Sequence, residues 1–297
     1  MCFPENDDMK DVNEVSLSAK ERHRVSHHDT MFDVFYGDVG DKSRKMSLPM
    51  VLGKMPCGRS LVRNLAKLPQ LLIAGAAGQG KTVFLHSFIC SLIKKKSPNE
   101  VRFVLMDSRH VEFNVYARLP HLYIPIVHTA KNGVEALTMI DAEMERRHMM
   151  FADAKCREIS AWNETNDKVK LPYIVVVIDE LLDFMIHAQR RFLALSSRIA
   201  ALGRAAGIHL VMATSRPAQN VIPGRLKANF PTRLAFPVSC QVDSRTILDA
   251  DGAESLNGSG DALFRDNTGE LFHLQTPYIN DKDIERIVAE ALNCNLV

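Results

Sequence analysis

The chain has 297 residues, 46% of them hydrophobic and 24% charged, which is enough for one large domain or two with a buried core. A formal net charge of +2 excludes a protein that coats nucleic acid by bulk positive charge, and leaves only local clusters of Arg and Lys for such contacts. Six scattered cysteines without a C-x-x-C pair argue against a disulfide framework or a zinc site, and no apolar run reaches the roughly 18–20 residues that a bilayer requires. We therefore expect a cytoplasmic protein with no direct insertion into a membrane.

Residues 1–46 are polar and lack sustained periodicity, apart from a short apolar patch at 31–36. From residue 47 to 297, apolar runs of strand length alternate with helical stretches. This alternation is typical of an α/β domain with a mainly parallel sheet and helices on both faces. The clearest strands are expected at Gln70–Gly75, Val101–Asp107, Tyr173–Asp179, His209–Ser215, Thr232–Val238 and Glu270–Gln275.

Helices are predicted at 81–93, 189–206 and 281–292, and a further one in mid-chain. On the mid-chain helix, apolar residues recur at helical spacing from Val134 to Met144, and the charged stretch 145–147 is expected on the opposite, polar side. Gly207 is expected to end the helix at 189–206, because glycine readily adopts the left-handed conformation found at helix ends.

The strongest motif is a phosphate-binding loop. The pattern G-x-x-x-x-G-K-[ST] is matched at each fixed position, between a predicted strand and a predicted helix, by Gly75, Ala76, Ala77, Gly78, Gln79, Gly80, Lys81 and Thr82. The glycines let the backbone N–H groups surround phosphate oxygens. Lys81 would place a cation beside the β- and γ-phosphates, and the Thr82 hydroxyl would ligate Mg²⁺. A plain glycine-rich turn is the alternative, but the full motif in this context favours ATP and Mg²⁺ as ligands.

Two carboxylates end the apolar strand predicted at 173–179. Asp179 is expected to hold Mg²⁺, and Glu180 to accept a proton from the water that attacks the γ-phosphate. Strands often end in solvated carboxylates, so the pair takes its meaning from the phosphate loop. Ligands of α/β sheets bind at the carboxyl ends of the strands, where both features are expected.

From about Leu48 to Ile287 the chain resembles the motor domain of FtsK/SpoIIIE DNA translocases. The most specific stretches are 227–233 and 242–249, supported by 65–69, 143–147, 203–209 and 213–217. The resemblance implies a RecA-like P-loop NTPase fold for the domain at 47–297. It also implies that residues 1–46 are a polar arm with the remnant of an amino-terminal subdomain.

The resemblance further implies an ATP-hydrolysing ring, a homo-hexamer, that moves along double-stranded DNA threaded through its pore. Arg204 is expected to reach the γ-phosphate of the neighbouring subunit as an arginine finger. Thr214 is expected at the end of the strand that senses the subunit's own γ-phosphate. Arg216 and Arg245 are expected on two pore loops that contact DNA phosphates. Without the resemblance, each of these arginines would be interpreted as a solvated surface charge.

Two residues depart from the family pattern. Ser215 stands where relatives usually have Gln, which affects sensing of the γ-phosphate. Gln241 stands where Lys is usual, so one cationic DNA contact is expected to be lost. Two other functions remain open: an FtsK-like ATPase of a protein-secretion system, which engages polypeptide, and a nucleotide-binding relative that is not a motor.

Overall fold

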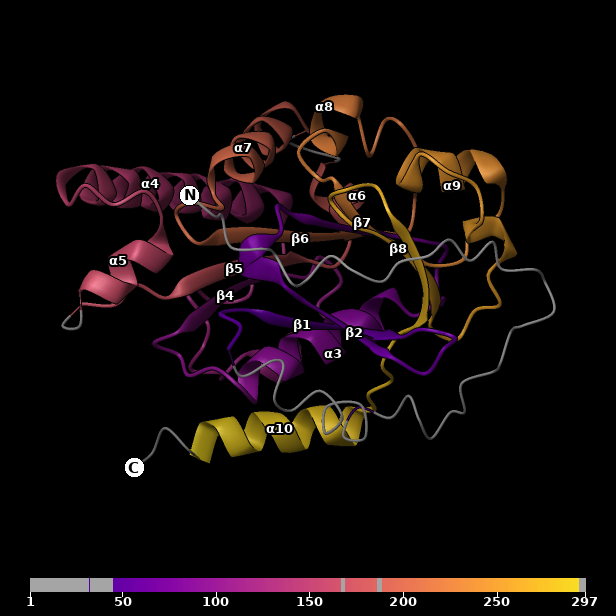
Figure 1. The fold of residues 1–297 in the computed structure, drawn as a ribbon, viewed down its shortest axis with the longest axis horizontal. Coiled ribbons are helices and arrows are strands. Elements are labelled where there is room, and N and C mark those ends of the chain that lie inside the picture. The colour runs from indigo at the N-terminus through magenta and orange to yellow at the C-terminus, as the bar shows by residue number, and fades with distance from the viewer. Residues whose placement is uncertain (1–31, 33–44, 167–168, 186–188, 294–297) are drawn as a thin grey trace, which may run out of the picture.

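A computed structural model describes residues 32, 45–166, 169–185 and 189–293 (Figure 1). Nearly all of the predicted arm at 1–46 lies outside these residues, so the domain boundary near residue 46 stays a prediction. Among the described residues, no helix combines the length and apolar character needed to cross a bilayer.

The described strands form one nine-stranded sheet in the order β2-β1-β9-β8-β7-β3-β6-β5-β4. Strands β7, β3, β6, β5 and β4 are mutually parallel, and β8, β9, β1 and β2 extend the sheet with antiparallel pairing. The predicted RecA-like α/β class is confirmed, in a sheet that is mixed rather than parallel throughout. The strand bounds are β1 Pro49–Lys54, β2 Ser60–Asn64, β3 Leu71–Ala74, β4 Val101–Met106, β5 Tyr173–Ile178, β6 Ile208–Thr214, β7 Thr232–Ala235, β8 Asp261–Arg265 and β9 Leu271–Gln275.

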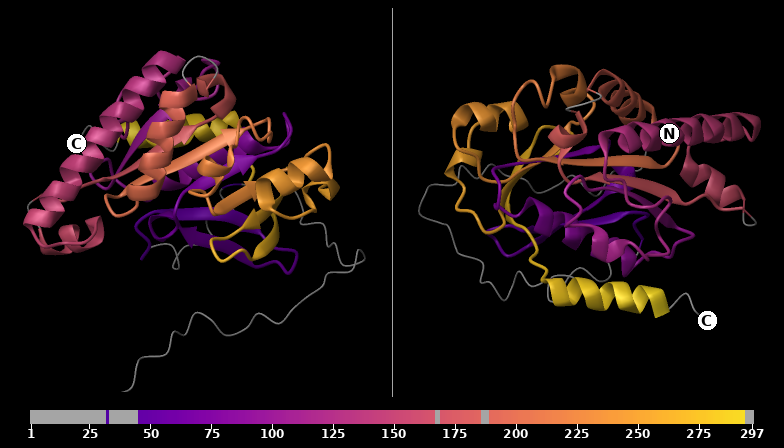
Figure 2. Two further views of the ribbon diagram at one scale, coloured as in Figure 1. Left: turned by 90° about the horizontal axis from the view of Figure 1, so that it is seen from above. Right: turned by 180° about the vertical axis from the view of Figure 1, so that it is seen from behind.

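Helices cover both faces of the sheet, with α4 and α7 on one face and α3 and α10 on the other (Figures 1 and 2). The helix bounds are α3 Lys81–Ile93, α4 Ala130–Asp153, α5 Ile159–Thr165, α6 Leu181–Met185, α7 Gln189–Leu202, α8 Gly224–Lys227, α9 Gln241–Leu248 and α10 Asp281–Asn293, with short 3₁₀ turns η2 Leu65–Lys67, η3 Asn114–Tyr116 and η4 Ala253–Ser255.

Each face has its own hydrophobic core, because successive side chains of a strand point to opposite faces. In β5, Val175 and Val177 pack with α3 and α10, whereas Ile174 and Val176 pack with α4 and α7. A strand buried on both faces is mainly apolar, which is why the sequence shows β3 and β5 as apolar runs. Strand β6 is also buried throughout, although it includes His209 and Thr214.

Helix α3 occupies the predicted range 81–93 without change, and α10 extends one residue beyond the predicted end. Helix α7 ends at Leu202, before the predicted Ala206. A Cβ on Gly203 would lie 2.6 Å from the Ile199 carbonyl oxygen, so the chain turns there at a position that accepts no side chain. One prediction on α4 is wrong: Arg147 is buried, because it lies three residues after Met144 and therefore on the same helix face.

Candidate nucleotide site

The phosphate loop connects β3 to α3 at the carboxyl edge of the parallel strands. Gly78 has a φ of +74°, a left-handed conformation that glycine adopts without strain. A Cβ on Gly75 would lie 2.6 Å from the Cβ of Phe236, which follows the neighbouring strand β7. The fold itself thus requires glycine at both of these positions of the motif.

Lys81 points into this loop. Its Nζ donates hydrogen bonds to the carbonyl oxygens of Gly75, at 2.8 Å, and Ala76, at 2.7 Å. Burial lowers the pKa of Lys81, and the negative charges of Glu180 and Asp179 act in the opposite direction. The ammonium group therefore lies within the loop that would surround the phosphates, as the motif predicts.

Thr82 and Asp179 meet across the strand ends. The Thr82 hydroxyl donates to Asp179 Oδ1 at 3.2 Å. Burial raises the pKa of Asp179 to about 6, and the charge of the nearby Glu112 adds to this effect. A hydroxyl beside a buried carboxylate is a donor set of hard oxygens, which fits Mg²⁺. Both residues can hold the metal, as the sequence predicts.

Glu180 is turned toward the end of β6. Its carboxylate accepts hydrogen bonds from the Thr214 hydroxyl at 2.7 Å, from the Ser215 N–H at 2.9 Å and from the Ser215 hydroxyl at 2.5 Å. Arg109 Nη2 lies 4.0 Å from Glu180 Oε2. The predicted base and the predicted sensor strand are therefore in direct contact, and Ser215 supplies two of the donors.

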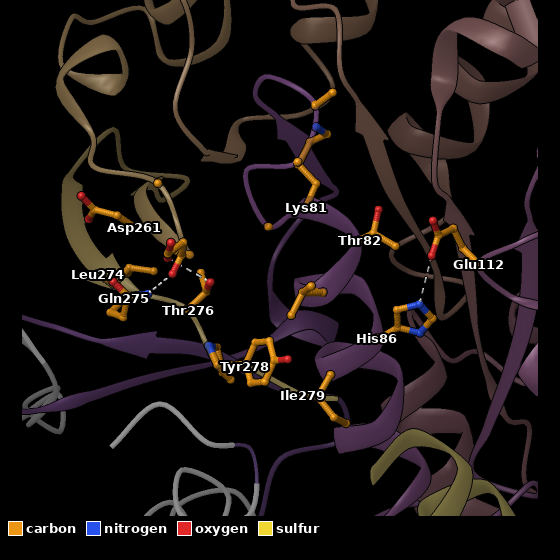
Figure 3. A pocket seen from close by; sticks show the side chains of 18 of the residues that line it. Lys81, Thr82, His86, Glu112, Asp261, Leu274, Gln275, Thr276, Tyr278 and Ile279 are labelled. Atoms are coloured by element: carbon orange, nitrogen blue, oxygen red, sulfur yellow. Dashed lines mark hydrogen bonds and ion pairs between the residues drawn. The ribbon is translucent and has the colours of Figure 1, made fainter. Parts of the chain in front are cut away.

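A cavity of about 900 Å³ is lined by Lys81, Thr82, Arg109, Asp179, Glu180 and Ser215, among others. Figure 3 shows Lys81 and Thr82 at the start of α3 and, in another part of the lining, Thr276 and Tyr278 from the segment between β9 and α10. The loop at 257–260 also lines the cavity and lies close to the phosphate loop, since a Cβ on Gly258 would lie 2.9 Å from Gln79 Oε1. The sequence motifs did not reveal Thr276 and Tyr278, because they follow the antiparallel strand β9 and belong to no nucleotide-binding pattern.

Arg109 and Glu112 were also missed. Both line the cavity, and Glu112 pairs with His86 of α3 at 3.7 Å. Arg109 follows the carboxyl end of β4 by three residues, so the rule that ligands bind at strand ends would have marked it as a candidate.

The three predicted partner-contacting arginines lie outside the cavity lining. Arg204 is exposed in the turn before β6, at the amino edge of the parallel strands and thus opposite the phosphate loop. Arg216 is exposed just after β6, and its N–H donates to the Thr214 hydroxyl at 3.2 Å.

Arg245 lies on helix α9 instead of in a loop. Its guanidinium makes a bidentate ion pair with Asp251, at 2.6 and 2.7 Å. Gln241, the departure from the family pattern, is the first residue of the same helix. Arg245 is therefore exposed but already paired.

The chain is similar in sequence to proteins of the FtsK/SpoIIIE family. A model of the FtsK/SpoIIIE family matches residues 38–219. The chain is 43% identical over 251 residues to the DNA translocase FtsK of Campylobacter jejuni subsp. jejuni serotype O:2, covering 83% of this chain and 26% of that protein. It is 44% identical over 253 residues to the DNA translocase SftA of Bacillus subtilis (strain 168), covering 84% and 27%. The chain thus spans about a quarter of the length of these relatives.

Solved structures share the fold. The pCW3 conjugation coupling protein TcpA, in its monomer form with ATPγS, superposes with a TM-score of 0.76 at 24% identity, covering 86% of this chain and 73% of that one. The cytoplasmic domain of the type VII secretion ATPase EccC from Thermomonospora curvata gives 0.73 at 21% identity, covering 82% and 31%. At these identities the likeness concerns the fold alone.

Proposed function

The chain belongs to the FtsK/SpoIIIE family, and on that premise we propose that it hydrolyses ATP and uses the energy to move along double-stranded DNA. The observation that carries the proposal is the convergence of Lys81, Asp179 and Glu180 on one cavity of about 900 Å³. A phosphate loop alone would support nucleotide binding. A second carboxylate beside the predicted metal ligand supports hydrolysis, since it provides a group that can accept a proton from water.

In the proposed reaction, the loop N–H groups and Lys81 bind the β- and γ-phosphates. Thr82 and Asp179 would hold Mg²⁺, which would offset the negative charge of the phosphates. Glu180 would accept a proton from the attacking water after leaving the donors of Thr214 and Ser215. Tyr278 and Ile279, which also line the cavity, offer aromatic and aliphatic surface for the adenine base of ATP.

The position of Arg204 supports a ring. Strand β6 has seven residues between the Arg204 turn and the nucleotide site, a span of roughly 20 Å at about 3.3 Å per residue. An arginine at that distance has no route to the γ-phosphate of its own subunit. We propose that Arg204 acts on the neighbour's nucleotide in a homo-hexamer, where its charge offsets the charge of the transition state.

Arg216 and Arg245 are proposed to contact DNA phosphates. Both are exposed, and Arg216 directly follows Ser215, whose N–H donates to Glu180, so that a DNA contact at Arg216 would adjoin the proposed catalytic carboxylate. Phosphate contacts carry no base information, and the proposed movement is therefore independent of DNA sequence.

The test is ATP hydrolysis by the purified chain with and without duplex DNA of increasing length, with Lys81→Ala as the inactive control. We expect turnover to rise strongly with long duplex and weakly with fragments too short to thread a ring. Turnover that is equal with and without DNA would contradict the motor and favour the protein-secretion function. No turnover in either condition would indicate a nucleotide-binding relative that is not a motor.

A further inference from the structure

The turn that carries Arg204, residues 203–207, is held from outside by three different elements. The Ala205 carbonyl accepts a hydrogen bond from Ile159 N, at the start of α5, at 2.9 Å. The Ala206 carbonyl accepts from Arg147 Nη1, on α4, at 2.9 Å. The Gly207 carbonyl accepts from Ile174 N, on β5, at 2.8 Å. Each of the three carbonyls that follow Arg204 thus has a partner on a separate part of the fold.

The turn also fixes itself internally. Gly207 has a φ of +74°, and a Cβ there would meet the side chain of Ile159. The Gly207 N–H donates to the Arg204 carbonyl at 3.0 Å, and the Ile208 N–H donates to the Gly203 carbonyl at 2.8 Å. The backbone of the turn has little freedom, although the Arg204 side chain that it carries is exposed.

Of the three external contacts, the one made by Arg147 has the largest cost in free energy, because it requires the burial of a charged group. Its side chain is 1% exposed, and it donates to Glu143 Oε1 at 2.7 Å and, through Nη1, to the carbonyls of Pro172 and Ala206, both at 2.9 Å. Removing a guanidinium from water costs several kcal/mol, and an apolar residue of similar volume often serves stability equally well. Stability of the fold is therefore a weak explanation for an arginine at this position.

Docking of α4 does not require Arg147 either. The helix already packs on the sheet and on α7 through fully buried apolar side chains, among them Leu137, Ile140 and Met144. What Arg147 adds is a planar guanidinium whose Nη1 binds two carbonyls at once, one before β5 and one before β6, while its Nε binds Glu143.

We propose that Arg147, held by Glu143, is a positioning residue that fixes the turn at 203–207 so that Arg204 reaches the nucleotide of the neighbouring subunit. This inference rests on the proposed function of Arg204. It assigns the paired charges of α4 to catalysis in the next subunit, although both residues lie far from any phosphate loop of their own chain.

The test uses Arg147→Met, which keeps the volume of the side chain and removes its donors. We expect ATP turnover of the assembled protein to fall roughly 10- to 100-fold, the cost of displacing a catalytic group by about 1 Å. Affinity for ATP and KM should stay near those of the unmodified chain, because its own phosphate loop is untouched. Arg146→Met is the matched control: Arg146 binds the same Glu143 but does not contact the turn, so turnover should be retained.

Mixed assemblies identify which side of the interface is impaired. A Lys81→Ala subunit has an intact turn and a defective nucleotide site, so it should rescue an Arg147→Met subunit by supplying Arg204 to it. An Arg204→Ala subunit cannot supply the arginine and should not rescue it. The double variant Arg147→Met/Arg204→Ala should be no slower than Arg204→Ala alone, because both changes remove the same contribution to turnover, that of Arg204.

Three results would overturn the inference. These are normal turnover of Arg147→Met while Arg204→Ala is inactive, rescue of Arg147→Met by Arg204→Ala subunits, and additive losses in the double variant. Normal turnover of Arg204→Ala would instead refute the arginine finger itself, so the two failures are distinguishable.

If Arg147→Met does not fold, Arg147→Lys gives the answer. It keeps a buried cation beside Glu143, but one ammonium nitrogen replaces the separate Nε and Nη1 donors that bind Glu143 and the two carbonyls. The same rescue by Lys81→Ala subunits is expected, with a smaller loss of turnover, and failure of that rescue would contradict the inference.

Discussion

At the carboxyl edge of β3, β5 and β6, the phosphate loop and the Asp179–Glu180 pair line one cavity and contact each other through side chains. At the amino edge of β5 and β6, Arg204 projects from a turn whose contacts are made by backbone carbonyls. At the carboxyl edge, the candidate catalytic residues of one chain lie together in one cavity. At the amino edge, Arg204 is exposed to solvent. On the proposed function, the carboxyl edge is a nucleotide site, and the amino edge contributes Arg204 to the site of another subunit.

The largest expected effect is at the carboxyl edge. Glu180→Gln should retain binding of ATP and Mg²⁺, since the amide has the shape of the carboxylate, but should lower turnover by about 10²-fold or more, the usual contribution of a general base. Pre-steady-state binding and single-turnover hydrolysis measure the two quantities separately. Asp183→Asn, on the adjacent helix but outside the cavity lining, is the control and should leave turnover close to unchanged. Weakened ATP binding with turnover preserved would contradict the role of Glu180.

The two edges should also differ in how their buried ionisable groups make the free energy of unfolding depend on pH. His209, in β6 near the amino edge, is fully buried, and burial lowers its pKa to about 4 from an ordinary 6.5. The unfolded chain therefore takes up a proton before the folded chain does, so His209 reduces stability as pH falls from 6.5 toward 4. Relative to His209→Leu, the free energy of unfolding of the unmodified chain should fall by about 2 kcal/mol between pH 7.5 and 5.

Urea titrations at both pH values measure this difference. Asp179, at the carboxyl edge, should act with the opposite sign, because its pKa is raised to about 6 from 3.8 and the folded chain takes up the proton first. Comparison with His209→Leu separates the two groups. A difference between the two proteins that is independent of pH would show that His209 does not titrate as its burial requires.

The third prediction concerns Ser215, which holds Glu180 in its present orientation. Ser215→Ala removes the hydroxyl donor and keeps the N–H donor, so Glu180 should turn toward water more easily. Turnover without DNA should rise by about fivefold, since one hydrogen bond contributes roughly 1 kcal/mol. Ser215→Thr keeps the hydroxyl and is the control. A fall in DNA-free turnover of the alanine variant would mean that Ser215 assists Glu180 instead of restraining it.

The smallest effect is expected on α9. Arg245→Ala should reduce the slope of log DNA affinity against log salt by about 0.9, which is one phosphate contact and about a threefold change in affinity between 50 and 200 mM salt. Asp251→Asn should have the reverse effect on affinity, because it releases Arg245 from its ion pair. DNA binding that is unchanged in both variants would place α9 away from DNA.

The sequence predicted the carboxyl edge well, because each of its elements has a local signal. Strands β3, β5 and β6 are mainly apolar runs bounded by polar residues, glycine or proline, and the observed ends lie within one residue of the predicted ones. Strand β8 was missed: only five residues long, it begins with Asp261 and ends with Arg265, so it lacks the apolar run of a strand buried on both faces.

The amino edge was not predictable in the same way. Arg147 and its neighbours were expected on the polar side of α4, since charged residues are seldom buried. Its burial depends on two carbonyls, of Pro172 and Ala206, that only the folded chain brings within reach. Similarly, the contact of Arg109 with Glu180 requires β4 to lie beside β5, and strand order has no signature in the sequence.

Strands β5 and β6 join the two edges directly. They pair in parallel from Ile174 beside Ile208 to Ile178 beside Met212, and the Thr214–Glu180 hydrogen bond links the segments beyond this ladder. A short ladder, buried on both faces, opens only when the surrounding core opens. Its amides should therefore be among the last to exchange with deuterium. We expect this ladder to keep the distance between Arg204 and Glu180 of one chain constant, so that the movements of the proposed motor occur in the segments at its ends.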